Sequence, residues 1–387
     1  MGSILNRRSM IEGALGASLG AFSTRLPRVS DVDNIAGEQL PAGSFNVKEF
    51  GAKGDGSSDD AGAFQAAIAA AGRVNGIVAV PASATKYVLG SPLTLAPNTR
   101  IEGAGGQSPT LRLREGEAMF NFVGKSEAEG LNVTLAHLSL ESGSSGNGVA
   151  VRARNFSGLF LRHVDIDHFN AGLWADWGIG VHLYGCSLIR NARALQVGGA
   201  GGPGGIRGGD RHADAFMDTI VVDACAFAQN GLDINDMGST RSLGVITIRD
   251  SSFYEAYTSP VPAKRMYVRI ANRKGVTVSG NWFEGGRPGH TCLYLGDYDH
   301  DGDHTSMCRG AAIFGNHFLQ TGATDTIGVD VASCDGATIF GNCFEFAASN
   351  KPIRLAGSVN ISSVGQNSYV TYPDRPGYPN PIAGGAP

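Results

Sequence analysis

The segment "GNWFEGG" begins at Gly280, "GNHFLQT" at Gly315 and "GNCFEFA" at Gly341, and "GQNSYVT" at Gly365 is a degenerate copy. A motif of Gly, Asn, any residue and an aromatic thus recurs at intervals of 35, 26 and 24 residues. Repeats of about 20 to 50 residues are typical of solenoids and propellers, in which one unit cannot bury its apolar face alone. We therefore expect stacked units, each marked by one copy of the motif.

The residue two positions after the motif Asn belongs to a longer series, which we call the anchors. The anchors are Leu140, Ile166, Leu188, Phe227, Phe253, Phe283, Phe318, Phe344 and Tyr369. The shortest gap, 22 residues, is one bare coil, and the longer gaps contain loops. Because Asn tolerates left-handed backbone better than most residues, we expect it to turn the chain while the anchor stacks inside a cylinder. A β-sandwich would not keep this register, so the series predicts a parallel β-helix of about nine coils.

The segment "FNVKEFGAKGDGSSDDAGAFQAAIAAAG" at residues 45–72 predicts a short strand, a Gly-rich turn and a helix capped near Ser58 or Asp59. One helical face would hold Phe64, Ala67, Ile68 and Ala71. The segment resembles the N-terminal cap of the pectate-lyase-like superfamily, whose members begin with a similar "FGAKGDG…DD…QAAI" run. This resemblance implies an all-β fold, a right-handed parallel β-helix behind a short capping helix. The superfamily contains lyases, hydrolases, epimerases and phage tailspikes, so the fold does not select an activity.

Composition excludes several classes of protein. Gly occupies 56 of 387 positions, about twice its usual share, but Pro is ordinary at 16, so the chain is not low-complexity disorder. A net charge of −4 argues against a general binder of nucleic acid or anionic membranes. No apolar run is long enough to predict a membrane-spanning helix.

Arg7 and Arg8 precede a Gly- and Ala-rich stretch, which resembles a twin-arginine export signal. The alternative is a flexible tail with an accidental arginine pair. We expect export to the periplasm or the cell exterior, and one β-helix domain. The predicted segments are an export signal at 1–24, a linker at 25–44, the β-helix at 45–375 with its cap at 45–105, and a tail at 376–387.

A short strand follows the anchors in successive coils: GVAVR, GLWAD, ALQVG, GLDIN, YVRIA, CLYLG, GVDVA and PIRLA. The second and fourth residues of each are apolar and point inward, because side chains alternate along a strand. The middle residues then point outward, about 4.8 Å apart from coil to coil. They predict an outer column of Ala150, Trp174, Gln196, Asp233, Arg269, Tyr294, Asp330 and Arg354.

This column changes its chemistry at every rung, whereas a purely structural column would repeat one residue type. Sugar rings stack on aromatic faces, so an exposed Trp174 favours a glycan groove. The alternative is an outer face filled with unrelated polar residues. Long segments at 198–215, 256–266 and 297–308 would wall the groove.

A basic cluster in this acidic protein favours an anionic ligand such as a polyuronate: Lys264, Arg265, Arg269, Arg273 and Lys274. β-Elimination from a uronate requires a cation at the carboxylate, a base for the C5 proton and an acid for the leaving oxygen. We assign Arg269 to the carboxylate and Tyr294 to the acid–base role, its phenol pKa lowered by the cation. Lys274 or His290 would be reserve bases. An ion pair of Arg269 with Asp233 is the structural alternative.

A glycoside hydrolase or glycosyl-transferring enzyme is the second hypothesis, and it needs a carboxylate pair, Asp233 with Glu255 or Asp236. The sequence lacks the Gly-His-Gly of polygalacturonases and the "DPHD" run of alginate epimerases. The third hypothesis is a non-catalytic, tailspike-like glycan binder. In all of them the substrate-binding residues would be Trp174, Gln196, Asn235, Asp236, Glu284, His290, Asp330 and Arg354.

The acidic run "GDYDHDGDHTSMC" matches the opening of a calcium loop, with Asp297, Asp299, Asp301 and Asp303 as ligands. The closing Glu is missing, because Cys308 occupies its position. A solvated acidic turn and a transition-metal site assisted by His300 and His304 are the alternatives. Calcium fits the lyase hypothesis, because lyases of the resembled superfamily often use it to bridge uronate and protein.

Register predicts two pairs of cysteines on neighbouring rungs, Cys308 with Cys334 and Cys186 with Cys225. Either disulfides or stacked free thiols are compatible with this spacing. Cys292 and Cys343 have no evident partners. The resemblance also implies a homotrimer as one assembly, since trimers are common in the superfamily.

Overall fold

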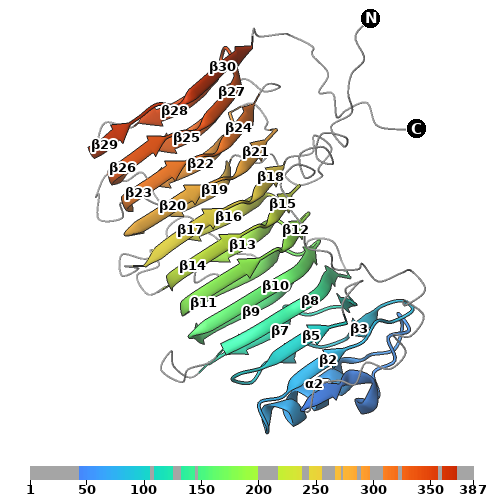
Figure 1. The fold of residues 1–387 in the computed structure, drawn as a ribbon. Helices are drawn as coiled ribbons and strands as arrows, with labels where there is room; N and C mark the ends of the chain where they lie inside the picture. Colours follow the sequence, from blue (N-terminus) through green and yellow to red (C-terminus); the bar gives the residue numbers. More distant parts are fainter. Residues whose placement is uncertain are drawn as a thin grey trace, which may run out of the picture. The chain divides into compact units, whose positions relative to one another are not determined.

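The computed structural model describes residues 43–104, 109–124, 132–143, 147–198, 217–237, 244–254, 266–271, 273–285, 289–296, 308–320, 325–355 and 360–372. All of them lie in one compact unit, residues 42–387. Each described strand pairs in parallel with strands of the adjacent coils, and successive coils stack into a long ladder (Figure 1). This confirms the predicted parallel β-helix.

The strands form three sheets. Sheet 1 contains β1 (Ser44–Asn46), β2 (Ile77–Val80), β5 (Arg100–Gly103), the first parts of β8 (Asn132–Ser142) and β10 (Gly158–Asp167), the last part of β11 (Ala171–Tyr184), β14 (Met217–Asp223), β17 (Val245–Arg249), β20 (Gly275–Ser279), β23 (Cys308–Phe314), β26 (Cys334–Phe340) and β29 (Asn360–Val364). Sheet 2 contains β3 (Tyr87–Leu89), β6 (Thr110–Leu113), the last parts of β8 and β10, β12 (Ser187–Ile189), β15 (Ala226–Ala228), β18 (Ser252–Tyr254), β21 (Trp282–Glu284), β24 (His317–Gln320), β27 (Cys343–Ala347) and β30 (Ser368–Tyr372). Sheet 3 contains β4 (Leu93–Thr94), β7 (Ala118–Val123), β9 (Val149–Phe156), the first part of β11, β13 (Arg193–Val197), β16 (Leu232–Met237), β19 (Met266–Ala271), β22 (Thr291–Gly296), β25 (Ile327–Val331) and β28 (Lys351–Leu355).

Helix α2 (Ala61–Gly72) lies at the N-terminal end of the stack, against β1, β2 and β4 (Figure 1). It follows the 3-10 turn η2 (Val47–Phe50). The Asp59 carboxylate accepts a hydrogen bond of 3.0 Å from the backbone N–H of Ala61, as expected for a residue at the start of the helix. The predicted helical face is buried in the main core: Phe64, Ala67, Ile68 and Ala71. The helix therefore covers the apolar end of the β-helix.

The anchors lie directly above one another in sheet 2, which confirms the predicted register. From Phe227 to Phe344 the rings stack nearly parallel, with centroids 4.7 to 5.0 Å apart. Two earlier rungs, Tyr87 and Leu111, continue the series below Leu140. The stack therefore begins inside the segment predicted as the cap and is longer than the sequence series.

The Asn residues of the repeat form a ladder inside the corner between sheets 1 and 2. The backbone N–H of Asn281 donates to Oδ1 of Asn316 at 3.1 Å, and that of Asn316 donates to Oδ1 of Asn342 at 3.0 Å. The Nδ2 atoms of Asn281 and Asn316 also donate to the next Oδ1, both at 2.9 Å. The residue with left-handed backbone is the preceding glycine, such as Gly280 with φ 66°. The prediction that Asn turns the chain is wrong: Gly turns it, and Asn satisfies buried backbone groups.

The register of sheet 3 confirms six of the eight predicted rungs. The outward residues, which we call the sheet 3 column, are Arg152, Trp174, Gln196, Asn235, Arg269, Tyr294, Asp330 and Arg354. Arg152 and Asn235 thus stand where Ala150 and Asp233 were predicted. Both errors have one cause. Where the chain enters sheet 3 from sheet 2, two successive residues point inward, so the strict alternation begins two residues later than assumed.

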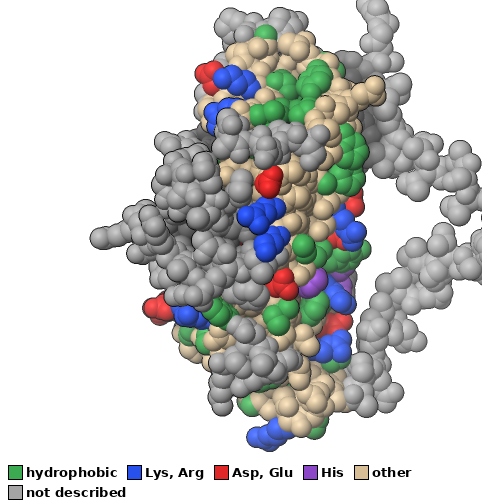
Figure 2. All heavy atoms as spheres, turned by 90° about the vertical axis from the view of Figure 1, so that its left-hand side faces the viewer, with side chains coloured by type: hydrophobic (Ala, Val, Ile, Leu, Met, Phe, Trp, Pro, Cys, Tyr) green, Lys and Arg blue, Asp and Glu red, His purple; other side chains and the backbone are tan. Residues whose placement is uncertain are grey.

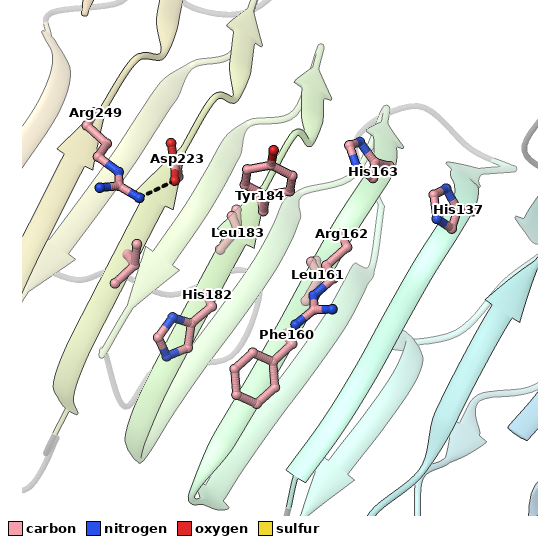
Figure 3. A pocket seen from close by; sticks show the side chains of 11 residues that line it. His137, Phe160, Leu161, Arg162, His163, His182, Leu183, Tyr184, Asp223 and Arg249 are labelled. Atoms are coloured by element: carbon pink, nitrogen blue, oxygen red, sulfur yellow. Dashed lines mark hydrogen bonds and ion pairs between the residues drawn. The ribbon is translucent and has the colours of Figure 1, made fainter. Parts of the chain in front are cut away.

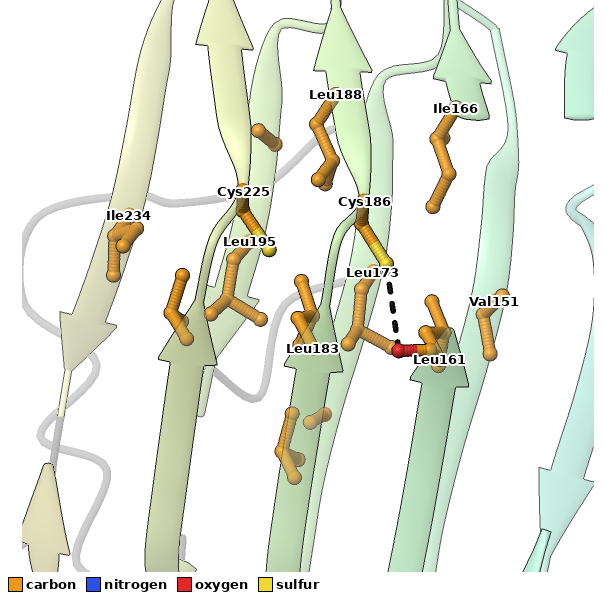
Figure 4. Close-up of a cluster of buried hydrophobic side chains, with 14 of the residues drawn as sticks. Val151, Leu161, Ile166, Leu173, Leu183, Cys186, Leu188, Leu195, Cys225 and Ile234 are labelled. Carbon is orange, nitrogen blue, oxygen red and sulfur yellow. Dashed lines mark hydrogen bonds between the residues drawn. The ribbon is translucent and has the colours of Figure 1, made fainter. Parts of the chain in front are cut away.

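All six cysteines are free thiols. Cys308 and Cys334 are register partners in sheet 1, as predicted. Cys186 and Cys225 lie side by side on neighbouring coils, among leucine and isoleucine side chains (Figure 4). Of the two alternatives, the structure has stacked thiols.

The predicted export signal at 1–24 lies outside the described residues, as do nearly all of the linker and the tail at 376–387. These segments remain predictions. Among the described residues, no helix is long and apolar enough to cross a membrane.

Candidate functional site

Sheet 3 is the sheet whose strands adjoin the longest connecting segments. Residues 199–216 follow β13, residues 255–265 precede β19, and residues 297–307 follow β22. By contrast, one residue with left-handed backbone joins sheet 1 to sheet 2 in most coils, such as Gly315. Because binding residues concentrate where loops border a rigid scaffold, the outer face of sheet 3 is the first candidate site.

The sheet 3 column lies on one face as predicted, but most of it is buried. Trp174 is 7% exposed, Asn235 and Tyr294 are 3% exposed, and Asp330 is 2% exposed. The expectation of a tryptophan projecting into solvent is therefore wrong. Column side chains pack on their neighbours one coil away, which removes much of their surface from water.

The N-terminal half of the column is aromatic and polar. The guanidinium carbon of Arg152 lies 5.1 Å from the ring centroid of Trp174, a cation–π contact. Asn235 Nδ2 donates to Gln196 Oε1 at 2.8 Å, and Gln196 Nε2 donates to the carbonyl of Gly198 at 2.9 Å. Trp174 Nε1 and Asn235 Oδ1 are buried without a hydrogen-bond partner among the described residues. Two polar atoms of this face therefore have hydrogen-bonding capacity that the described residues do not use.

The C-terminal half of the column alternates cation, phenol, carboxylate and cation. The guanidinium carbon of Arg269 lies 5.9 Å from the ring centroid of Tyr294, its partner on the next coil. Arg354 Nε donates to Asp330 Oδ1 at 2.8 Å, and its Nη2 contacts Oδ2, so the pair is bidentate. The hydrogen bond to this carboxylate raises the pKa of Arg354. Asp330 is therefore neutralised by Arg354 rather than presented to a ligand.

Asp233, predicted as a catalytic carboxylate, lies in the interior and is fully buried. Its Oδ1 accepts a hydrogen bond of 2.9 Å from Asn230 Nδ2. The equivalent residues of other coils, such as Ala194 and Cys292, belong to the hydrophobic core. The assignment of Asp233 to the outer face is therefore wrong.

Asp236, predicted to bind substrate, also points inward, since its register partners Val197 and Ile270 are core residues. It forms a bidentate ion pair with Arg273, at 2.5 Å from Nε and 2.8 Å from Nη2. Both side chains are fully buried. Arg273 was predicted to belong to a basic cluster that binds ligand, but it is buried and neutralises Asp236 in the interior.

Three further predicted site residues lie away from the column. Lys274 is exposed just before β20 of sheet 1, beyond the corner where the chain leaves sheet 3. Glu284 ends β21 of sheet 2, where its Oε2 accepts a hydrogen bond of 2.9 Å from Trp282 Nε1. His290 is buried with its ring edge-on to Tyr267, at a centroid distance of 4.3 Å. None of the three belongs to the sheet 3 column.

The predicted catalytic Glu255 lies outside the described residues. The same holds for the predicted calcium ligands Asp297, Asp299, Asp301 and Asp303. Their roles remain predictions.

A second candidate surface, missed in the sequence, is a pocket of about 560 Å³ on the outer face of sheet 1 (Figure 3). Strands β8, β10, β11, β14 and β17 supply its lining. The lining residues are His137, Phe160, Leu161, Arg162, His163, His182, Leu183, Tyr184, Val221, Asp223 and Arg249.

Rings dominate this sheet 1 pocket. His182 stacks on Phe160 with centroids 4.9 Å apart, and His163 lies between His137 at 5.2 Å and Tyr184 at 5.4 Å. Tyr184 is 49% exposed, so its ring face is accessible. Figure 2 shows basic, acidic, hydrophobic and histidine side chains following one another along one side of the stack.

Charge also shapes the sheet 1 pocket. Arg249 Nη2 donates to Asp223 Oδ2 at 2.5 Å on its rim (Figure 3). Burial, assisted by the nearby Arg162, lowers the pKa of His182, so this ring is neutral at neutral pH. The sequence does hold a signal for the pocket, because Phe160 and His182 each precede their anchor by six residues.

Comparison with known proteins supports the fold. Residues 44–157 match the family model described as rhamnogalacturonase A/epimerase, pectate lyase-like. A search of curated protein sequences finds no match. The surface protein and adhesin PfbA of Streptococcus pneumoniae superimposes with a TM-score of 0.50 at 12% identity, over 84% of this chain and 100% of that chain.

Two further solved structures are more distant in shape. The A-module of mannuronan C-5 epimerase AlgE6 from Azotobacter vinelandii is 19% identical with a TM-score of 0.40, covering 86% of this chain and 100% of that one. ORF18 of Geobacillus virus E2 is 18% identical with a TM-score of 0.42 over 85% of this chain, and the match spans 61% of the viral protein. The chain therefore has the parallel β-helix fold, and its N-terminal part, residues 44–157, is similar to the family described as rhamnogalacturonase A/epimerase, pectate lyase-like.

Proposed function

We propose that the protein acts on polysaccharide, and that it is a lyase that cleaves a uronate-containing glycan on the outer face of sheet 3. The observation that carries this proposal is the stacking of Arg269 on Tyr294 on neighbouring coils, with 5.9 Å between guanidinium carbon and ring centroid. A guanidinium beside a phenol combines carboxylate neutralisation with acid–base chemistry, as β-elimination requires. The family model matched by residues 44–157, described as rhamnogalacturonase A/epimerase, pectate lyase-like, supports an activity on polysaccharide.

In the proposed reaction, Arg269 binds the uronate carboxylate and stabilises the charge that develops when the C5 proton leaves. The ionised oxygen of Tyr294 takes that proton. The electron pair forms the C4–C5 double bond while the C4–O bond breaks, and the phenol returns the proton to the leaving oxygen. Because Tyr294 is 3% exposed, the outer face must open when the glycan binds.

A lyase fits the column better than a hydrolase does. An inverting or retaining hydrolase needs two carboxylates that flank the scissile bond. Among the described residues of the sheet 3 column, Asp330 is the one carboxylate, and Arg354 neutralises it. Asp233 and Asp236 lie in the interior and cannot provide the predicted pair.

The test is the exchange Tyr294→Phe, with pectate, alginate, glycosaminoglycans and neutral glucans as substrates. We expect the wild type to release unsaturated products that absorb at about 235 nm, and the variant to lose about 10²- to 10⁴-fold in rate. Tyr254→Phe is the matched control, because Tyr254 is an exposed tyrosine of sheet 2. Reducing ends without ultraviolet absorbance would contradict a lyase, and an unchanged rate in Tyr294→Phe would exclude that residue.

Calcium, export and trimerisation belong to this proposal as predictions. If Asp297, Asp299, Asp301 and Asp303 hold calcium between protein and uronate, EGTA abolishes activity and added calcium restores it. Insensitivity to the chelator would remove the ion from the mechanism. Cleavage of the leader during periplasmic expression tests export, and light scattering of the purified chain tests the homotrimer.

A second candidate function is glycan binding without cleavage, favoured by the open aromatic pocket on sheet 1. The accessible ring of Tyr184 and the stacked rings of Phe160 and His182 offer flat faces for sugar rings. We expect Tyr184→Ala to weaken retention on an immobilised glycan about two- to tenfold, as loss of one stacking partner implies. Retention unchanged by Tyr184→Ala but lost in Tyr294→Phe would place binding on sheet 3 instead.

A further inference from the structure

A cluster of metal-ligating side chains lies on the outer face of sheet 2. His317 begins β24, Cys343 begins β27 on the next coil, and Glu345 follows two residues later. His317 and Cys343 are register partners, and Glu345 shares the face of Cys343 because side chains alternate along a strand. One ligand atom of each residue lies within 4.8 Å of the other two.

The contact between His317 and Glu345 is not an ordinary hydrogen bond. Nε2 of His317 lies 2.8 Å from Oε1 of Glu345, yet it makes no hydrogen bond of acceptable angle within the described part of the chain. The imidazole nitrogen and the carboxylate oxygen therefore converge on one point, together with the thiol of Cys343. Ligand atoms around a tetrahedral zinc are separated by roughly 3.3 Å, given zinc–nitrogen distances of about 2.0 Å, so the imidazole and the carboxylate must move slightly apart when an ion binds.

The cluster is accessible from solvent. Cys343 is the partly exposed cysteine of the chain, whereas the other five are buried. The side chains of His317 and Glu345 are 27% and 25% exposed. An ion can therefore approach the cluster from solvent, and it reaches Nε2 of His317, which is itself covered, once the surrounding side chains shift.

We propose that His317, Cys343 and Glu345 bind a divalent transition-metal ion, zinc foremost, with water at a fourth position. Zinc accepts imidazole nitrogen, thiolate sulfur and carboxylate oxygen together, whereas calcium and magnesium take oxygen ligands. On binding, the S–H bond of Cys343 breaks, the sulfur–metal bond forms and the proton passes to solvent. This site is separate from the acidic run that predicts calcium.

Trp282 packs against the ligand from one coil earlier. Its ring lies 4.2 Å from the imidazole of His317, centroid to centroid, and its Nε1 donates to Glu284 Oε2 at 2.9 Å. Glu284, predicted to bind substrate, therefore fixes the indole that covers the metal ligand. The position of a histidine ring in a metal site is commonly set by such supporting contacts.

The experiment uses the metal-free full-length chain, titrated with Co²⁺ and followed by absorbance. Thiolate bound to Co²⁺ gives a charge-transfer band in the near ultraviolet, whereas cobalt held by oxygen or imidazole alone does not. We expect a band that saturates at one equivalent and disappears when Zn²⁺ is added. Cys343→Ser should abolish the band, and His317→Ala and Glu345→Gln should weaken binding at least tenfold.

The controls separate this site from other binding and from misfolding. His168→Ala removes a half-exposed histidine elsewhere and should leave the titration unchanged. Cys343→Ser exchanges one atom on the surface, so its far-ultraviolet circular dichroism should match the wild type. Absence of the thiolate band in the wild type, or its persistence at equal affinity in Cys343→Ser, would overturn the proposal.

Discussion

At the scale of single residues, the interior ion pair of Asp236 and Arg273 is the largest departure from an apolar core. The guanidinium satisfies its remaining donors on the backbone carbonyls of Met217 and Asp218, at the start of β14. It thereby ties sheet 3 to sheet 1 inside the β-helix. Loss of one partner from a buried pair is costly, because the other charge stays buried without compensation.

We expect Asp236→Ala to lower the free energy of unfolding by about 3–5 kcal/mol. Urea denaturation measures this change, with Asp335→Ala as the control because Asp335 is exposed on β26. The double variant Asp236→Ala/Arg273→Met should recover much of the loss, since no charge remains buried. A cost below about 1 kcal/mol for Asp236→Ala would mean that water reaches Arg273.

Burial also keeps two thiols protonated and so lowers their reactivity. It raises the pKa of Cys308 to about 12 and that of Cys334 to about 11, against an ordinary value of 9.0. At pH 8 we expect a thiol reagent to label Cys343 in the folded protein and the other cysteines only after denaturation. Rapid labelling of Cys308 in the native chain would contradict the interior assignment.

The same shifts set a pH dependence of stability. In the unfolded chain these thiols ionise near pH 9.0, while in the fold they keep their protons to about pH 11–12. Stability from this source is therefore present below pH 9 and falls as pH rises through 9 to 12, because the unfolded state loses protons first. Chemical denaturation between pH 8 and pH 10.5 measures the slope.

At the scale of elements, the corner between sheets 1 and 2 contains one residue with left-handed backbone in each coil from β8 to β26. Glycine fills it at Gly280, Gly315 and Gly341, but Ala224 fills it with φ 52°. Left-handed backbone costs a residue with a Cβ about 1–2 kcal/mol. The alanine is exposed, so the cost has no compensating packing.

We expect Ala224→Gly to stabilise the protein by up to about 1 kcal/mol, since relief of strain exceeds the extra freedom of glycine in the unfolded chain. Gly315→Ala is the reciprocal variant, because a Cβ there meets nothing closer than 3.8 Å and only the backbone cost applies. It should destabilise by about 1–2 kcal/mol. Thermal melts of both test the argument, and equal melting temperatures would refute it.

Prediction from sequence succeeded where one side chain can occupy only one environment. Phe at an anchor must be interior, so the register of sheet 2 was predictable, and alternation then placed Arg269 beside Tyr294. It failed at corners, where two successive residues point inward, as at Asp233. Burial of Trp174 and the rings around His182 were not predicted, because both depend on side chains of adjacent coils that lie far apart in the sequence.

At the scale of the whole molecule, the β-helix is a one-dimensional stack in which each coil contacts its neighbours. Cys308 and Cys334 occupy the same position on successive coils. We therefore expect deletion of residues 308–333, one whole coil, to leave a folded and cooperatively unfolding protein. Deletion of residues 308–320, part of a coil, should abolish folding because all later strands lose register. Circular dichroism and limited proteolysis distinguish the two, and equal behaviour of both deletions would refute the stacked description.

Helix α2 covers the end of the stack that the ribosome makes first. Once helix α2 and the first coils have formed, the last coil presents an apolar interior edge and unpaired backbone N–H and C=O groups to the nascent chain. Each new turn can then be added in the order of translation, without waiting for the C-terminus. Only the most recent turn is open to other chains during synthesis, which keeps a protein made almost entirely of strands from aggregating before it is complete.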